Sequence, residues 1–224
     1  MEQFRPVFRG RPWSADRLGP GMGARALHVY AVPDLSVDRD LAALVAGCRE
    51  AMAGHPILPA PDEFLHLTLD MVSARYSDLI GAADRARLTA ALQARLAHTD
   101  AFTVTLGSPL AGRAGALLDI HPDTDVDALH HRIRETVDAV VPSDLHHLVP
   151  PVHMSLGYSY DSGDSDRLQS ALRRVRPGHA TMTVTGVQLV DVLFRQVPAP
   201  GGRRAWELSW NTLATIPLRS ASCN

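Results

Sequence analysis

The predicted elements of this chain run through the same series twice. Each half reads strand, helix, proline-rich break, strand, helix, strand, judged from the alternating or helical spacing of apolar residues. The spacing repeats as well. His66 lies 38 residues after His28 in the first half, and His153 lies 36 residues after Leu117 in the second. A duplicated order predicts two similar lobes related by pseudo-symmetry, with equivalent strands meeting where the lobes join and clefts form.

The element boundaries follow from apolar spacing and from Gly and Pro breaks. In the first half we expect a strand over 27–32, a helix over 38–53, a strand over 64–72, a helix over 82–97 and a strand over 102–106. In the second half we expect a strand over 116–120, a helix over 126–140, a strand over 152–158, a helix over 165–175, a strand over 181–185 and a last strand over about 205–213. Residues 1–25, rich in Gly, Pro and Arg, are interpreted as an irregular arm.

Composition narrows the class of protein. The chain has 224 residues, of which 46% are hydrophobic and 21% charged, as in ordinary globular proteins. Lys and Arg number 22 against 24 Asp and Glu, so the chain lacks the basic excess of a protein that binds nucleic acid over a broad surface. Any chemistry on nucleic acid would therefore need a local site. Cys48 and Cys223 form neither a C-x-x-C motif nor a disulfide framework, which fits a reducing cytoplasm. No secretory signal is visible, and no apolar stretch approaches the roughly 18–20 residues of a membrane span.

Two motifs of the form H-x-[ST] occupy equivalent places in the duplicated order. Residues i and i+2 of a strand point to the same face, so His66 and Thr68 share one face, as do His153 and Ser155. A third match begins at His179, opens the strand after the second-half helix and has no counterpart in the repeat, so we interpret it as chance. Either histidine alone would be interpreted as a hydrogen-bonded structural residue. The matched pair favours a functional site.

Two imidazoles and two hydroxyls in one place suit the opening of a phosphodiester bond. Histidine has an ordinary pKa of about 6.5, so it gives or takes a proton near neutral pH. In-line displacement at phosphorus needs a base at the attacking oxygen and an acid at the leaving oxygen, on opposite sides, and two facing histidines supply both. The hydroxyls of Thr68 and Ser155 can donate to the non-bridging oxygens as their charge grows. This scheme requires no metal.

The segments His66-Leu67-Thr68-Leu69 and His153-Met154-Ser155-Leu156 resemble the paired motifs of the two-histidine phosphoesterase superfamily, and above all its bacterial 2′-5′ RNA ligase and cyclic phosphodiesterase branch. The 87-residue separation of the two histidines is typical of that family. The resemblance covers residues 26–217 as a single bilobal domain and leaves 218–224 as a tail. It implies an α+β fold of two pseudo-symmetric lobes, each an antiparallel sheet with helices, flanking a central cleft.

The same resemblance implies action on 2′,3′-cyclic phosphates or 2′-5′ linkages in nucleotides or RNA ends, by hydrolysis or by reversible formation. Carried over residue by residue, it makes His66 and His153 the acid–base pair and Thr68 and Ser155 the phosphate binders, with no metal and no cofactor. We therefore expect a cytoplasmic enzyme whose partner is a nucleotide cyclic phosphate or an RNA end, without a membrane and without a strong signal for a protein partner. The alternative is a non-catalytic module that binds RNA ends or nucleotides on the same fold. An acyl hydrolase using Ser155 ranks low, because no G-x-S-x-G elbow surrounds it.

Several other residues have both a functional and a structural interpretation. Arg113 is a candidate phosphate contact, with a solvated turn arginine as an equal alternative. Tyr158 or Trp210 could stack on a base, although core packing is favoured for both. Asp70 could orient a group in the cleft or simply end its strand in solvent. Gly157 could let a substrate approach closely, or serve loop flexibility.

Two further pairs of adjacent histidines give weaker signals of function. His130 and His131 are adjacent on a helix and face different ways, so we expect both on the surface. His146 and His147, with His153, are a weak metal candidate, because no Cys or carboxylate spacing supports zinc.

Overall fold

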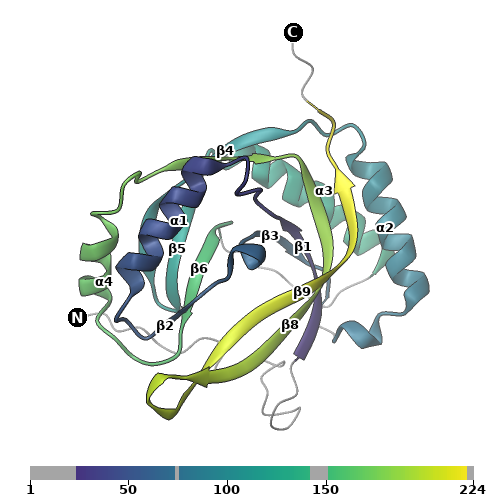
Figure 1. Ribbon diagram of the computed structural model, residues 1–224. Coiled ribbons are helices and arrows are strands. Elements are labelled where there is room, and N and C mark those ends of the chain that lie inside the picture. The colour runs from purple at the N-terminus through teal and green to yellow at the C-terminus, as the bar shows by residue number, and fades with distance from the viewer. Residues whose placement is uncertain (1–23, 74–75, 142–150, 221–224) are drawn as a thin grey trace.

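The computed structural model describes residues 24–73, 76–141 and 151–220, and the strands within them form one antiparallel sheet. The strand order is β7-β4-β5-β6-β3-β1-β8-β9, and the short β2 pairs with β6 outside this path. The strands are β1 (Ala24–Ala31), β2 (Ile57–Pro59), β3 (Leu67–Met71), β4 (Phe102–Gly112), β5 (Gly115–His121), β6 (Met154–Ser159), β7 (Ala180–Val184), β8 (Gly186–Ala199) and β9 (Arg203–Pro217). Figure 1 shows this sheet strongly curled, with helices on its outer side.

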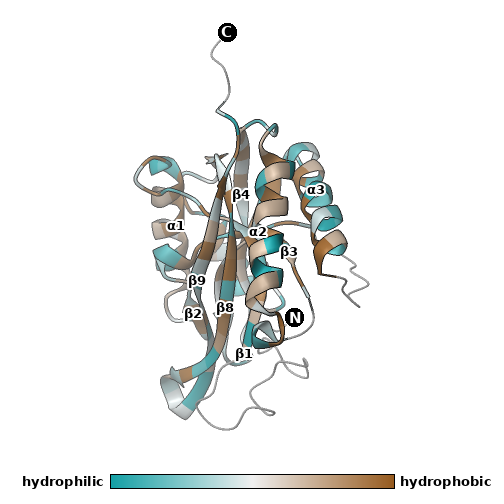
Figure 2. Ribbon diagram, turned by 90° about the vertical axis from the view of Figure 1, so that its right-hand side faces the viewer, coloured by the Kyte–Doolittle hydropathy of each residue, from teal (hydrophilic) through white to brown (hydrophobic). Residues whose placement is uncertain are grey.

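The described residues also form four α-helices and several short 3-10 turns. The helices are α1 (Arg39–Met52), α2 (Ala82–Leu96), α3 (Thr124–Val140) and α4 (Ser165–Leu172), and the turns are η2 (Asp62–Phe64), η3 (Ser77–Leu79) and η4 (Pro200–Gly202). The α1 helix packs beside α4, and α2 packs beside α3. Hydrophobic and hydrophilic residues alternate along α2 and α3 in Figure 2, as expected of helices that cover a core on one side only. No helix in these residue ranges is long and apolar enough to cross a membrane.

The sheet divides between β6 and β3 into two four-stranded lobes. One lobe holds β4, β5, β6 and β7 under α1 and α4, and the other holds β1, β3, β8 and β9 under α2 and α3. The predicted α+β fold of two pseudo-symmetric antiparallel lobes is confirmed. The sequence halves are nevertheless interleaved, because β4 and α1 of the first half pack in the lobe of β6, and α3 of the second half packs in the lobe of β3.

The main apolar core lies beneath all four helices. It includes alternate residues of the two motif strands, among them Leu67, Leu69, Met154 and Leu156, each at most 1% exposed. A second apolar cluster lies on the other face of β1, β8 and β9 and holds Ala26, Tyr30, Val190, Val192, Phe194, Trp206 and Leu208. Period-two alternation therefore places the residues between the core positions on the face of the sheet away from the helices.

The largest difference from the sequence prediction is β8, a 14-residue strand that the prediction left out. It lies between β1 and β9 and is covered on both faces, with Val187 and Leu189 in the main core and Val190 and Val192 in the second cluster. Apolar residues on both faces, interrupted by Gln188 and Asp191, give neither clean period-two alternation nor a continuous apolar run, so the pattern did not reveal this strand.

The chain ends of the domain also differ in detail from the expected limits. The predicted irregular arm lies almost wholly outside the described residues, and β1 begins at Ala24. At the other end Leu218, expected in the tail, is buried, and Arg219 forms an ion pair with Asp100.

Candidate active site where the two lobes join

The two motif strands, β3 and β6, are neighbours at the centre of the sheet. Their antiparallel register pairs the middle residue of the first motif, Leu67, with the middle residue of the second, Met154. Both of these side chains lie in the core under the helices, so the outer residues of each motif face the opposite side of the sheet. The register extended by one residue in each direction gives two cross-strand neighbours, His66 beside Ser155 and His153 beside Thr68.

Both motif histidines are held by the same local hydrogen bond. The Nδ1 atom of His66 lies 2.9 Å from the carbonyl oxygen of Phe64, and the Nδ1 atom of His153 lies 3.0 Å from that of Pro151. A carbonyl oxygen can only accept, so in both rings Nδ1 carries the proton and donates. In the neutral ring Nε2 then has a free lone pair for a substrate. The two lobes thus present their imidazoles in the same tautomer.

The two imidazoles differ in burial. His66 is 6% exposed and stacks on Tyr30 with 3.9 Å between ring centroids, while Trp210 meets it edge-on at 5.2 Å. Burial lowers the pKa of His66 to about 4, an effect that the Phe64 carbonyl opposes and nearby His153 reinforces. His153 is half-buried. One histidine is therefore kept neutral by its apolar surroundings, and the other lies closer to solvent.

Each motif hydroxyl is hydrogen-bonded to a tyrosine. Thr68 bonds the hydroxyl of Tyr30 on β1, and Ser155 bonds the hydroxyl of Tyr158 on β6. Burial raises the pKa of both phenols, so they remain protonated hydrogen-bonding groups. The Tyr30 hydroxyl also lies 2.8 Å from Nδ1 of His28. These contacts can fix the direction in which Thr68 and Ser155 point their protons.

Tyr30 and His28 were missed by the sequence analysis, which used that segment only as a strand. Two polar-tipped rings at i and i+2 on a strand otherwise made of small and aliphatic residues are the signal that could have found them. Tyr158, named for stacking or packing, is half-buried against the second apolar cluster.

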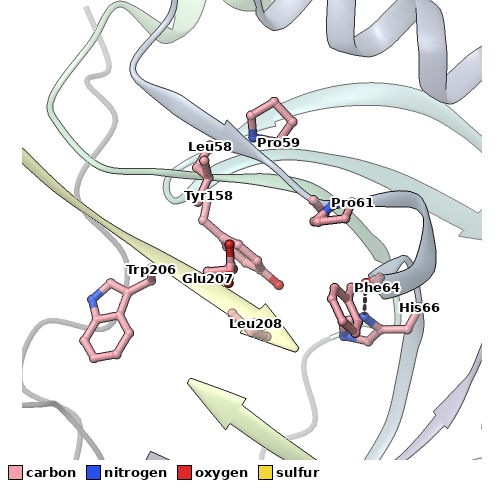
Figure 3. A pocket seen from close by; sticks show the side chains of 10 residues that line it. Leu58, Pro59, Pro61, Phe64, His66, Tyr158, Trp206, Glu207 and Leu208 are labelled. Carbon is pink, nitrogen blue, oxygen red and sulfur yellow. Dashed lines mark hydrogen bonds between the residues drawn. The ribbon is translucent and has the colours of Figure 1, made fainter. Parts of the chain in front are cut away.

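A small hollow adjoins His66, and we call it the β2–β9 hollow. It is lined by Leu58, Pro59, Ala60, Pro61, Phe64, His66, Tyr158, Trp206, Glu207 and Leu208. Figure 3 shows the Tyr158 ring on one side and the Phe64 and His66 rings on another, with the carboxylate of Glu207 on β9 facing the same space. Trp210, the other candidate for base stacking, packs instead against Phe64, Tyr30 and His66.

Arg113 lies away from the motif residues. It occupies the exposed turn between β4 and β5. The next residue, Ala114, accepts a hydrogen bond from the backbone N–H of Ser159, which is the last residue of β6. Arg113 therefore neighbours the end of β6 that is farther from His153, and the structure favours a turn arginine over a direct phosphate contact.

Asp70 takes neither of its two expected roles. A bulge in the β1–β3 pairing sets Val29 opposite Asp70 and Tyr30 opposite Thr68. Because of this bulge, Asp70 does not share the strand face of Thr68, although it lies two residues later. Its side chain is 1% exposed and forms an ion pair with Arg134 of α3 at 3.0 Å. Burial raises the pKa of Asp70 to about 6 against the opposing effect of Arg134. This pair joins β3 to α3 beneath the site.

The expectation that His130 is a surface residue is wrong. It is 8% exposed, and its Nδ1 bonds the backbone carbonyl of Leu69 on β3, because this side of α3 packs on the sheet. Its neighbour His131 is exposed, as predicted. The pair His146 and His147 lies outside the described residues. Within the described ranges, no three His, Cys, Asp or Glu side chains group closely enough to hold a metal ion.

Gly157 makes room for a strand rather than for a substrate. A Cβ atom on Gly157 would lie 2.7 Å from the carbonyl oxygen of Leu58 and 3.0 Å from the Cα of Pro59. Both belong to β2, which pairs with β6 at this point. The missing side chain lets β2 approach and form one wall of the β2–β9 hollow.

The comparison with protein families decides the affiliation of the chain. The family described as the 2′-5′ RNA ligase superfamily matches residues 33–193, which is more than half of the sequence and includes both motifs. The chain belongs to the 2′-5′ RNA ligase superfamily. This membership confirms the resemblance drawn from the two H-x-[ST] segments, and it supports an enzyme of the phosphoesterase type. No match was found among curated proteins.

Solved structures share the fold of this superfamily member at low identity. The TT0787 protein of Thermus thermophilus has a TM-score of 0.58 and 17% identity, over 87% of this chain and 98% of that one. E. coli LigT complexed with 3′-AMP has a TM-score of 0.59 and 15% identity, again over 87% and 98%. A protein described as a phosphoesterase has a TM-score of 0.54 and 15% identity over the same shares. At such identities the likeness shows the fold alone.

Proposed function

We propose that this protein is a metal-independent phosphodiesterase that hydrolyses, or reversibly forms, 2′,3′-cyclic phosphate or 2′-5′ phosphodiester linkages in nucleotides or RNA ends. The observation that carries the proposal is the matched pair of imidazoles where the lobes join. In each ring the Nδ1–H group donates to a backbone carbonyl oxygen, with Nδ1 to oxygen distances of 2.9 Å for His66 and 3.0 Å for His153. Nε2 is then left to contact the substrate. An acid and a base of the same chemical kind suit a reaction that can run in both directions.

In hydrolysis of a 2′,3′-cyclic phosphate, one imidazole takes a proton from the attacking water while its oxygen bonds to phosphorus. The other imidazole enters this step protonated on both ring nitrogens and gives its Nε2 proton to the ribose oxygen whose bond to phosphorus breaks. Thr68 and Ser155, held by Tyr30 and Tyr158, donate to the non-bridging oxygens. Ligation exchanges the two roles, with a ribose hydroxyl in place of water.

Nucleotides as substrates have support from a protein of the same fold. E. coli LigT has been solved with 3′-AMP, with ATP and with NADP⁺. The cysteine use of the sequence fits our expectation of a cytoplasmic enzyme, and Cys48 is free and buried.

The experiment is turnover of 2′,3′-cyclic nucleotides by the purified full chain in the presence of EDTA, with the monophosphate product identified. His66→Asn and His153→Asn are the test variants, because an asparagine amide can still donate to the backbone carbonyl but cannot transfer a proton. We expect activity that survives EDTA and falls by at least about 100-fold in each variant. The product, a 2′- or a 3′-phosphate, identifies the oxygen that leaves.

The matched control is His179→Asn, at the third H-x-[ST] segment. His179 lies before β7, where its ring neighbours His121 and Ser108 in the lobe of β6 rather than at the junction of the lobes. This variant is expected to keep wild-type activity. Wild-type activity in either motif variant contradicts the acid–base assignment. Absence of turnover on cyclic nucleotides and on RNA ends, with binding retained, identifies the non-catalytic binding module instead.

A further inference from the structure

We propose that His28 is a positioning residue, whose Nδ1–H group donates to the Tyr30 hydroxyl and thereby turns the hydroxyl proton of Thr68 towards the bound phosphate. The inference rests on the proposed function, because it concerns the phosphate on which the two histidines act. It goes further than the proposed function, which gives His28 no role. His28 acts through its two neighbours and does not itself touch the reacting atoms.

Position is the first argument. Leu27 and Val29 of β1 lie in the main core, so His28 and Tyr30 point to the opposite face of the sheet, which carries the site. The β1–β3 register sets Tyr30 directly opposite Thr68. The three side chains therefore form a row that begins at a buried imidazole and ends at the hydroxyl that we expect to bind phosphate.

The contacts within this row are the second argument. The Nδ1 atom of His28 lies 2.8 Å from the hydroxyl oxygen of Tyr30, and the same hydroxyl bonds Thr68. His28 is 6% exposed and Tyr30 is 1% exposed. Packing holds the imidazole in place, because Tyr30 stacks on it with 5.3 Å between ring centroids and Phe194 meets it edge-on at 5.9 Å. Hydrogen bonds at this depth polarise one another, so the direction of one sets the direction of the next.

The number of protons is the third argument. A phenol has one proton to donate. If Nδ1 of His28 carried only a lone pair, Tyr30 would donate to it, and Thr68 would donate to Tyr30 and turn its own lone pairs towards the phosphate. If Nδ1 carries a proton, the Tyr30 oxygen accepts it and the Tyr30 proton goes to Thr68.

The second arrangement is the one that suits the reaction. It leaves the Thr68 proton for a non-bridging oxygen of the phosphate, where negative charge grows as the reaction proceeds. The phosphate in turn favours this arrangement, because every dipole of the row then points its positive end towards the negative charge. A proton on Nδ1 of His28 thus excludes the direction of the row that would repel the substrate.

The test is a double-mutant cycle on His28 and Tyr30 in the full chain. The readouts are kcat/KM for 2′,3′-cyclic nucleotides and the Kd of inorganic phosphate, measured by calorimetry. His28→Leu removes the donor and is expected to lower kcat/KM and to weaken phosphate binding by about fivefold each where Tyr30 is present. In Tyr30→Phe the row is already broken, so the same change is expected to alter both readouts by less than about twofold. Equal losses in the two backgrounds would show that His28 serves packing alone and would overturn the proposal.

Two further variants separate the hydrogen bond from the packing around it. His28→Asn is the rescue, because the asparagine amide nitrogen lies at about the place of Nδ1 and can donate to Tyr30, and it is expected to stay within about twofold of the wild type. Phe194→Leu is the matched control, since it loosens the packing on His28 and leaves the hydrogen bonds in place. It is expected to behave like the wild type. A loss in either variant as large as that in His28→Leu contradicts the role of the donor.

A measurement on the wild type does not depend on the folding of any variant. The nitrogen chemical shifts of the His28 ring, recorded by NMR with inorganic phosphate bound, tell which ring nitrogen carries a proton. We expect a protonated Nδ1, and an unprotonated Nδ1 overturns the proposal. Coupling between His28 and Tyr30 in phosphate binding without turnover refutes only the proposed function, and turnover without this coupling refutes only the role of His28. A wild type that neither turns over cyclic nucleotides nor binds phosphate refutes both.

Discussion

The burial of His66 predicts a measurable loss of stability in acid. The pKa of this imidazole falls from about 6.5 in the unfolded chain to about 4 in the fold, because its ring is buried against Tyr30 and Trp210. Between pH 6.5 and pH 4, His66 is therefore protonated in the unfolded chain but stays neutral in the folded chain. The stability that neutral His66 allows is complete above pH 6.5, is lost as pH falls from 6.5 to 4, and changes no further below 4.

The magnitude follows from the size of the pKa change. A decrease of about 2.5 pH units at about 1.36 kcal/mol per unit amounts to about 3 kcal/mol between pH 7 and pH 4. This is a large part of the roughly 5–15 kcal/mol stability of an ordinary domain. The assay is urea unfolding, followed by tryptophan fluorescence at several pH values, of the wild type and of His66→Asn.

Asp70 acts in the opposite direction over the same pH range, because burial raises its pKa to about 6. The comparison between wild type and His66→Asn removes this contribution, since Asp70 is present in both proteins. We expect the free energy of unfolding of the variant, relative to that of the wild type, to rise by about 3 kcal/mol from pH 7 to pH 4. If both proteins lose stability with acid equally, the desolvation argument is refuted.

Trp210 provides an independent test of the cause. Trp210→Ala opens one side of the His66 ring to water, and the pKa of His66 measured by NMR titration is expected to move from about 4 towards 6.5. Trp210→Phe keeps an aromatic cover and is expected to leave the pKa near the wild-type value. A pKa equally low in Trp210→Ala would show that burial by this ring is not the cause.

Three further changes test the structure around the site. Arg134→Met leaves the carboxylate of Asp70 buried without its partner, and urea unfolding at pH 7 is expected to show a loss of about 3–5 kcal/mol. The loss is expected to shrink at pH 5, where Asp70 can take a proton, and an equal loss at both pH values contradicts the ion-pair argument. Gly157→Ala sets a methyl group against the β2 backbone and is expected to cost about 1–3 kcal/mol in the same assay; unchanged stability would mean that β2 moves away freely. Tyr30→Phe keeps the aromatic ring on His66 but removes the hydroxyl that bonds Thr68. The kcat/KM for cyclic nucleotides is expected to fall about tenfold with little change in unfolding, and wild-type kinetics would exclude a positioning role for that hydroxyl.

The sequence contained the two motifs and the duplicated order of elements, and these two signals were sufficient to predict the fold class and the superfamily. Both signals are local. Period-two alternation tells which residues share a strand face, and it correctly separated His66 from Leu67 and His153 from Met154. The equivalence of the two motif strands also predicted that they meet where the lobes join, and β3 and β6 do so.

Local patterns could not predict contacts between elements distant in the sequence. The burial of His130 follows from the packing of α3 on β3, and the Asp70–Arg134 pair from a bulge in the β1–β3 ladder. The exchange of α1 and α3 between lobes has the same origin, because either sheet could accept an amphipathic helix and only the joint packing of all four selects one arrangement.

The residues of the candidate site divide in the same way. The sequence alone determined that two imidazoles and two hydroxyls lie on strand faces at equivalent places, because side-chain direction in a strand depends only on the parity of the position. Only the tertiary structure decided that Tyr30 stacks on His66, that Tyr158 bonds Ser155 and that Glu207 faces the β2–β9 hollow. Burial, pKa and hydrogen-bond partners are properties of the packed environment, which residues far apart along the chain create together.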